Sequence, residues 1–322
     1  MKKIFYSILA LVSALTMTSC SSGDPEYPDF DYQTVYFASN VVMRTVELGR
    51  DQEVDLTMDN QHKVRITATM GGSYGNKRDI TVNIAVDPTL LDGKTFEDGT
   101  PMTLMPSDYY KMADTKIVIP AGNILGGVEV QLTDAFFNDP KSLSNNYVIP
   151  VKMTQLVSGA DSILENNNFV LYTLKYVNPW HADYLRRGTD EITSAAGTRT
   201  VERKAEYVER DETVYLKTTG YMTDLLDITV KDDDNKDINV GLQLTFNQEG
   251  TCSITSATEG ITVSGTGNFV VDGEKKVING EDRDALYLEY TINIADKGIT
   301  YKTKDTLVLK ARGIRPEYMT LK

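Results

Sequence analysis

One short segment of the sequence combines aromatic rings with several hydrogen-bonding side chains. Trp180 and Tyr184 flank His181, and Arg186 and Arg187 follow directly. Sugars present apolar C–H faces that pack on aromatic rings, and hydroxyl groups that polar side chains bind. The segment therefore predicts ligand-binding roles for Trp180, His181 and Tyr184. Packing of Trp180 and His181 at a domain boundary is the alternative.

Two further tyrosines are predicted to lie on the polar faces of strands. Tyr215 alternates with the apolar Val214 and Leu216, and Tyr287 lies opposite the apolar face of the segment Leu286–Ile294. Successive side chains of a strand point to opposite faces, so Tyr215 and Tyr287 could form a shallow glycan-binding surface. Aromatic residues are also common on ordinary half-exposed strands, so a purely structural role remains open.

Catalytic motifs are weak. Substrate-assisted glycosidases need carboxylates spaced as Asp-x-x-Asp-x-Asp-x-Glu. The nearest match begins at Asp224, but Thr229 and Lys231 occupy the two decisive positions. His62 and His181 are the only histidines, and His62 lies in a segment typical of a turn. The sequence therefore favours a protein without enzymatic activity.

Metal and thiol chemistry are not expected either. The acidic run at 232–237 is rich in aspartate, but a calcium loop starting at Asp233 would need Gly at Ile238 and Glu at Leu244. The run is predicted to be a solvated hairpin loop, and we expect no metal and no cofactor. Cys252 lies in a strand-like alternation and is predicted to be a small buried residue.

The N-terminus has the organisation of an export signal. Two lysines precede an apolar run at Ile4–Val12, and the small residues Thr18 and Ser19 precede Cys20. The apolar run is shorter than the roughly 20 residues that a membrane-spanning helix needs. Residues 1–19 are therefore predicted to be a signal peptide.

The residues around the predicted cleavage site suggest a lipid anchor. The segment Met17–Cys20 resembles a bacterial lipobox, which implies lipidation of Cys20; ordinary secretory cleavage is the alternative. Residues 20–30 are polar and acidic, as expected for a flexible tether. They resemble the signals that send Bacteroidota lipoproteins to the outer face of the outer membrane, where we expect this chain. A merely solvated linker is the alternative.

The charge balance narrows the choice of partner. The sequence has 33 basic and 46 acidic side chains, for a net charge of −13. Nucleic acid is a poor partner for such a chain, because binding to phosphates depends on an excess of lysine and arginine. A neutral ligand, a cation or plain solubility outside the cell all remain compatible with this charge.

Apolar and polar residues alternate with a period of two along most of the chain, and helical periodicity is nearly absent. This pattern predicts an all-β fold. A domain boundary is predicted at Asn178–Pro179, giving domains at 31–177 and 178–322. Strands are predicted at Thr81–Val86, Lys116–Ile119, Val128–Leu132, Phe169–Val177, Thr213–Thr218, Leu242–Phe246, Leu286–Ile294 and Thr306–Ala311. The dipeptides Asp272–Gly273 and Asn279–Gly280 tolerate positive φ and are predicted to form hairpin turns.

Two groups of segments resemble known modules. The first group consists of Arg78–Gly93, Met102–Asp134 and Asn145–Met153. Its second segment contains P-S-D-Y-Y and I-P-A-G, and its third segment contains Y-V-I-P-V. It is similar to the Ig-like N-terminal domain-of-unknown-function module of Bacteroidota surface lipoproteins, which implies an Ig-like β-sandwich. The segments Trp180–Gly188 and Leu307–Met319 resemble the paired C-terminal β-domains, some of them lipocalin-like. This implies an antiparallel β-barrel or sandwich.

The resemblance also implies a functional setting. Proteins with this module belong to polysaccharide-utilisation clusters, where the module is a spacer or a sugar-binding domain. We therefore expect a non-catalytic glycan-binding accessory lipoprotein that binds an oligo- or polysaccharide and hands it to an outer-membrane transporter complex. A structural or adhesin-like surface lipoprotein and a divergent glycan-processing enzyme are the alternatives.

Overall fold

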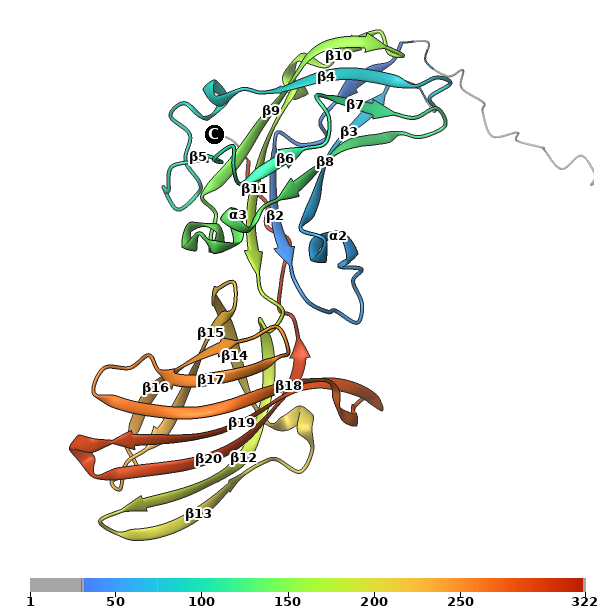
Figure 1. Cartoon of the computed structure of the whole chain (residues 1–322). Helices are drawn as coiled ribbons and strands as arrows, with labels where there is room; N and C mark the ends of the chain where they lie inside the picture. The colour runs from blue at the N-terminus through green and yellow to red at the C-terminus, as the bar shows by residue number, and fades with distance from the viewer. Residues whose placement is uncertain (1–29, 31, 74, 321–322) are drawn as a thin grey trace, which may run out of the picture.

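The computed structural model of the chain describes residues 30, 32–73 and 75–320, and the predicted signal peptide, Cys20 and most of the tether lie outside this range. The described residues form two β-bodies joined end to end (Figure 1). None of the helices in this part of the chain is long and apolar enough to cross a membrane. The all-β prediction is therefore confirmed.

The N-terminal body is a sandwich of two sheets. One sheet has the order β10-β1-β3-β8-β6, and the other has the order β2-β11-β9-β4-β7, with β5 beside β9. The strands are β1 (Thr34–Tyr36), β2 (Val41–Glu47), β3 (Lys63–Gly71), β4 (Ile80–Val86), β5 (Thr103–Leu104), β6 (Tyr110–Met112), β7 (Lys116–Ile119), β8 (Leu125–Leu132), β9 (Tyr147–Ser158), β10 (Ser162–Ile163) and β11 (Phe169–Val177).

The alternation of the sequence explains how the sandwich closes. In β4, Ile80, Val82 and Ile84 are buried, while the residues between them are more exposed. The inward side chains of both sheets form one apolar core, as expected for two packed sheets. Few helices interrupt the sandwich: α2 (Thr57–Asn60), α3 (Asp134–Asn138), η1 (Pro88–Leu91), η2 (Pro140–Leu143) and η3 (Glu165–Asn167).

The C-terminal body is an eight-stranded closed β-barrel. Neighbouring strands are antiparallel, and pairing of the first strand with the last closes the barrel, while β13 extends beside the first strand. The strands are β12 (Ala182–Ser194), β13 (Gly197–Arg203), β14 (Glu212–Gly220), β15 (Thr223–Lys231), β16 (Asp237–Phe246), β17 (Thr251–Ser256), β18 (Ile261–Ile278), β19 (Glu281–Ile294) and β20 (Ile299–Ala311). Two short helices, η4 (Val208–Arg210) and η5 (Ala295–Lys297), lie in its connections. Between the two architectures that the sequence left open, the chain adopts the barrel.

Two predicted turn dipeptides have different fates. Asn279 and Gly280 both have positive φ and form the hairpin turn between β18 and β19. Asp272–Gly273 was expected to form a hairpin as well, and this prediction is wrong. The dipeptide lies inside β18, where the register with β19 shifts between Val270 and Glu274. Positive φ at Asp272 therefore serves a β-bulge rather than a chain reversal.

Three segments connect the sandwich and the barrel. The first is the linker from β11 to β12, and the second is the loop after β2. These two segments meet closely at Gly49, which has φ of 98°, because a Cβ there would lie 2.7 Å from the Cα of Pro179. The third is the segment after β20, where Glu317 forms an antiparallel bridge with Met43 of β2. The buried Arg312 donates hydrogen bonds to the carbonyls of Leu48, Asn178 and Pro179, so one guanidinium ties all three segments together.

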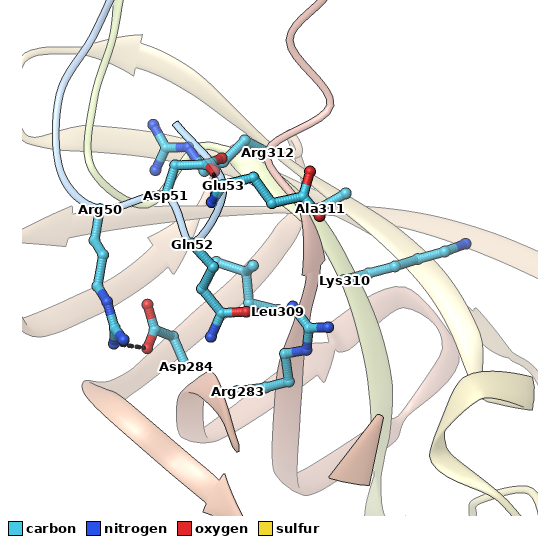
Figure 2. Close-up of a pocket in the computed structure, with 10 residues that line it drawn as sticks. All are labelled: Arg50, Asp51, Gln52, Glu53, Arg283, Asp284, Leu309, Lys310, Ala311 and Arg312. Carbon is cyan, nitrogen blue, oxygen red and sulfur yellow. Dashed lines mark hydrogen bonds and ion pairs between the residues drawn. The ribbon is translucent and has the colours of Figure 1, made fainter. Parts of the chain in front are cut away.

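A small recess marks the same joint. It has a volume of about 120 Å³ between the loop after β2 and the strands β19 and β20 (Figure 2). Arg50 reaches across it to the carboxylates of Asp272 and Asp284, at 2.9 and 3.0 Å. Arg283 donates to the side-chain oxygen of Gln52 at 2.6 Å. The recess is smaller than the roughly 300 Å³ at which ligand pockets begin, so we interpret it as a contact between the domains.

Candidate functional site

A larger cleft lies on the joint and contains two of the predicted site residues. Its volume is about 350 Å³, which falls in the range of small-molecule sites. The end of β11, the strand β14 and the segment after β20 form its walls. The lining of this cleft includes the side chains of Lys175, His181, Tyr215, Lys217, Arg315 and Glu317.

His181 holds the ring of Tyr215 in place. The backbone N–H of Thr218 donates to Nδ1 of His181 at 3.1 Å, so the network assigns the ring proton to Nε2. Nε2 then donates to the hydroxyl oxygen of Tyr215 at 2.8 Å. The two rings meet edge to face, with centroids 5.1 Å apart. Tyr215 is 45% exposed, so it presents a ring of fixed orientation to solvent.

The same histidine is neutral at ordinary pH. Burial, together with the nearby cations Arg312, Lys175 and Lys217, lowers the pKa of His181 to about 4. A neutral imidazole keeps one acceptor and one donor nitrogen, which the contacts with Thr218 and Tyr215 require. The contact with Tyr215 is therefore maintained across the physiological pH range.

Charged side chains surround this tyrosine. Lys175 forms an ion pair with Glu317, which also accepts a hydrogen bond from Asn145 at 2.8 Å. Lys217 and Arg315 form no ion pair with any residue that the structure describes. The cleft thus offers an aromatic platform with cationic, anionic and amide groups at its edge, a composition suited to a polar ligand with a ring face.

Trp180 and Tyr184 do not line this cleft. Trp180 is 6% exposed and stacks on Phe246, with centroids 3.9 Å apart and planes inclined by 8°. Tyr184 is fully buried and donates its hydroxyl proton to the carbonyl of Trp180 at 2.8 Å. Both rings belong to the apolar core of the barrel and are covered by their neighbours. Neither ring is accessible to a ligand, so we assign no ligand-binding role to Trp180 or Tyr184.

Tyr287 lies away from the cleft, on β19. Its hydroxyl donates to Glu274 at 2.9 Å. Burial, and to a smaller extent this hydrogen bond, raises the pKa of Tyr287 to about 12. The cleft therefore brings together His181 and Tyr215 from the predicted set. Sequence reasoning missed Lys175, Lys217 and Arg315. The sequence could have indicated Lys217, because it lies two positions after Tyr215 on the same strand face.

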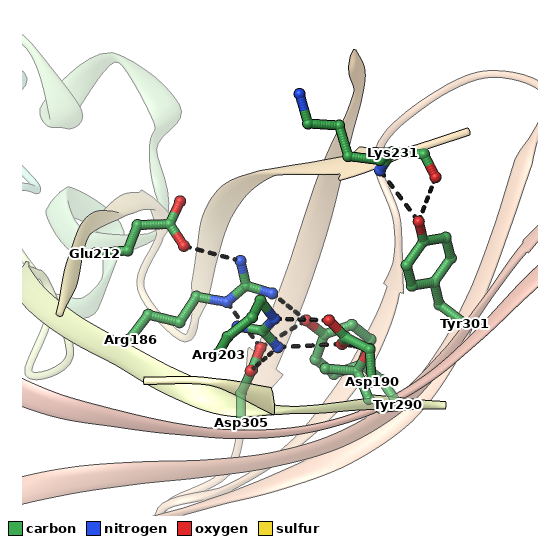
Figure 3. Close-up of polar contacts among 9 residues, drawn as sticks. Arg186, Asp190, Arg203, Glu212, Lys231, Tyr290, Tyr301 and Asp305 are labelled. Atoms are coloured by element: carbon green, nitrogen blue, oxygen red, sulfur yellow. Dashed lines mark hydrogen bonds and ion pairs between the residues drawn. The ribbon is translucent and has the colours of Figure 1, made fainter. Parts of the chain in front are cut away.

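The interior of the barrel contains a second polar cluster (Figure 3). Asp305 is inaccessible to solvent and accepts from Arg186 at 2.9 Å, from Arg203 at 2.6 Å and from the Tyr290 hydroxyl at 2.7 Å. Arg203 also pairs with Asp190 at 2.7 Å. Burial strongly raises the pKa of Tyr290, which keeps its proton. Each charge has an opposite partner here, so we interpret the cluster as part of the barrel core.

Two groups with catalytic potential, Asp224 and Ser73, make structural contacts with other residues that the structure describes. Asp224 is fully buried, where burial raises its pKa to about 7, and it accepts a hydrogen bond from Asn178. Residues 71–75 match the Gly-x-Ser-x-Gly pattern of hydrolases. Ser73 there contacts Gln33 and the carbonyl of Gly75 rather than a histidine. No helix follows it directly in the described chain, as a nucleophile elbow would require.

The acidic loop lies between β15 and β16, as the sequence predicted. Asp232 accepts from the backbone N–H groups of Asp234 and Lys236, and it pairs with Lys297 at 3.0 Å. Its carboxylate therefore stabilises the loop itself. Within residues 30, 32–73 and 75–320, no group of three or more His, Cys, Asp or Glu side chains could hold a metal ion. Cys252 is buried, as predicted, and burial raises its pKa to about 12.

Comparison with known proteins places the chain in a family. A model described as a domain of unknown function (DUF5627) matches residues 179–313, and a model of an N-terminal domain matches residues 30–159. The first matched range corresponds to the barrel described above, and the second to most of the sandwich. A solved structure from Bacteroides ovatus, of unknown function, shares 46% identity at a TM-score of 0.84 and covers 89% of this chain and 97% of its own. The chain belongs to the family of that Bacteroides protein.

Other comparisons add no argument. Two further Bacteroides ovatus structures, one of unknown function and one reported as a candidate carbohydrate-binding protein, have 16% and 14% identity and TM-scores of 0.39 and 0.29. They cover 86% of this chain and 94% and 98% of their own. Scores this low say nothing about a common site. No curated protein matches the chain.

Proposed function

We propose that the protein is a non-catalytic glycan-binding lipoprotein of the cell surface, and that the cleft beside Tyr215 is its binding site. The observation that carries the proposal is the exposed tyrosine ring held edge-on by His181 in a cleft of about 350 Å³. An aromatic platform of fixed orientation loses little conformational entropy when a sugar ring stacks on it.

The polar groups around the ring support the same proposal. A sugar needs donors and acceptors for its hydroxyl groups, and the cleft supplies both. Lys175 and Lys217 are donors, while Glu317 and the hydroxyl of Tyr215 can accept. A glycan-processing enzyme would in addition need paired carboxylates facing the ligand, and Glu317 is already engaged by Lys175.

The cellular setting is part of the proposal. A lipid on Cys20 and the acidic residues that follow it would hold the two domains at the outer face of the outer membrane. There the protein would bind an oligo- or polysaccharide and pass it to an outer-membrane transporter complex. The family resemblance supports this assignment.

Replacing the platform tests the binding site. The full chain is screened on a broad glycan array, and retention is confirmed by affinity electrophoresis with the glycan that binds. Tyr215→Ala should weaken the binding by about tenfold or more, the effect typical of a central aromatic contact. Circular dichroism and the unfolding midpoint should stay close to those of the wild type, because the ring is half exposed.

A second exposed tyrosine provides the control. Tyr207 is 54% exposed and does not line the cleft, so Tyr207→Ala should bind as the wild type does. Equal binding by the wild type and Tyr215→Ala would refute the site. A wild-type protein that ignores every glycan on the array would refute the function, and capture of a protein from the outer membrane would then favour the adhesin-like alternative.

A further inference from the structure

We propose that the cleft selects acidic saccharides, whose carboxylate or sulfate group binds between Lys217 and Arg315. This inference rests on the proposed glycan-binding function and names the class of sugar. It starts from the contrast between the charge of this cleft and the charge of the whole chain, which is −13.

The cleft is locally cationic. Its charged lining consists of Lys175, Lys217, Arg315 and Glu317. Glu317, the one acid among them, is already paired with Lys175. Lys217 and Arg315 therefore provide two positive charges that no carboxylate of the described residues neutralises through an ion pair.

Several other exposed cations of the barrel are paired with acids. Lys302 bonds to Glu191 at 3.0 Å, and Lys304 bonds to Glu289 at 2.8 Å, both on the outer surface of the strands. In a chain with an excess of acids, such pairing is the expected arrangement. Lys217 and Arg315 lack such a partner and line the same cleft, where one ligand anion could pair with both.

A buried cation behind the cleft adds to the positive potential. Arg312 is 4% exposed, and its guanidinium donates to three backbone carbonyls rather than to a carboxylate. It lies close enough to act on His181, whose pKa it lowers together with Lys175 and Lys217. A buried charge is screened less by solvent than an exposed one, so Arg312 favours an anion in the cleft.

The spacing suits a sugar ring that carries an acid group. Tyr215 and Lys217 lie on the same face of β14, and two residues along a strand span roughly 7 Å. A pyranose ring on Tyr215 would then place an acid group at its edge near Lys217, with Arg315 across the cleft. Asp183 pairs in register with Tyr215 but does not line the cleft.

The experiment compares acidic and neutral polysaccharides. The full chain is run in affinity electrophoresis with polygalacturonate and chondroitin sulfate, and with dextran, mannan and galactan as neutral polymers. The expected result is retention by one or both acidic polymers, weakened by added salt. The double substitution Lys217→Gln and Arg315→Gln should reduce this retention by about tenfold or more, because it removes two charge-assisted hydrogen bonds.

A matched control changes the same net charge elsewhere. The double substitution Lys302→Gln and Lys304→Gln removes two lysines from the outer surface of the barrel and should leave retention unchanged. Equal losses in both double variants would overturn the inference, because they would indicate a general charge effect. Unchanged retention in the cleft variant would overturn it as well.

The outcomes also separate this inference from the proposed function. Retention by neutral polymers alone, lost in Tyr215→Ala, would overturn the acidic preference and leave glycan binding intact. Absence of retention by every polymer, together with a silent glycan array, would overturn both.

Discussion

Two buried titratable groups at the joint are expected to compensate each other as the pH changes. Asn178 connects them: its side chain donates to Asp224 at 2.6 Å, and its backbone N–H donates to the hydroxyl oxygen of Thr218 at 3.1 Å. Thr218 in turn hydrogen bonds to Nδ1 of His181. Asp224 and His181 are both less than a tenth exposed, so each of them contributes to the pH dependence of stability.

The two contributions have opposite signs. Burial raises the pKa of Asp224 from 3.8 to about 7, so its stabilising contribution is present at low pH and is lost as the pH rises through 7. Burial lowers the pKa of His181 from 6.5 to about 4, so its contribution is present above pH 6.5 and is lost as the pH falls towards 4. Between pH 8 and pH 5, Asp224 should add about 3 kcal/mol and His181 should remove about 2 kcal/mol, at about 1.4 kcal/mol per pKa unit.

Replacing Asp224 by Asn should reveal the pH dependence of stability that His181 contributes. The amide keeps an oxygen that can accept from Asn178 but does not titrate, so the compensation is lost. The free energy of unfolding of Asp224→Asn should fall by about 2 kcal/mol between pH 8 and pH 5, while these two groups leave the wild type within about 1 kcal/mol. Urea unfolding at several pH values measures this, with fluorescence of Trp180, the single tryptophan, as the signal.

An exposed aspartate provides the control for this measurement. Asp234 lies in the loop between β15 and β16 and has a largely exposed side chain, so Asp234→Asn should follow the wild-type curve. Parallel curves for the wild type and Asp224→Asn would refute the reasoning, since they would mean that Asp224 titrates alike in the folded and unfolded chain.

Two other substitutions test the joint and the barrel core. Arg312→Ala removes hydrogen bonds to three carbonyls and should lower the free energy of unfolding by about 2 to 4 kcal/mol, with faster proteolysis of the linker; unchanged urea unfolding and proteolysis would contradict the role of Arg312. Asp305→Ala leaves the buried Arg186 and the half-buried Arg203 without this partner and should cost about 3 to 5 kcal/mol in urea unfolding. A loss below about 1 kcal/mol would show that the cluster is not desolvated as described.

The strands could be predicted because burial on one face leaves a period of two in the sequence. Turns were less certain, because the same dipeptide chemistry serves two purposes. Asn279–Gly280 and Asp272–Gly273 both supply positive φ, yet one reverses the chain and the other makes a bulge. Only the pairing of the flanking residues with β19 separates these cases, and pairing is a tertiary property.

The site was harder to predict than the fold. Trp180 and Tyr184 were predicted to bind a ligand because of their aromatic side chains and polar neighbours. Each lies two residues from Ala182, which faces the barrel core. Counting along the strand would have favoured burial. Lys175 and Arg315 come from segments that meet only after folding, so no local pattern could connect them to Tyr215.

The bridge between Glu317 and Met43 has a consequence for the ribosome-bound chain. The strand β2 leaves the ribosome long before the segment after β20, so the sandwich can acquire its core while one wall of the cleft is still missing. The cleft is therefore completed late in synthesis, together with the closing strand of the barrel. A nascent protein would become competent to bind only once the two domains have docked, which makes ligand binding a late marker of maturation.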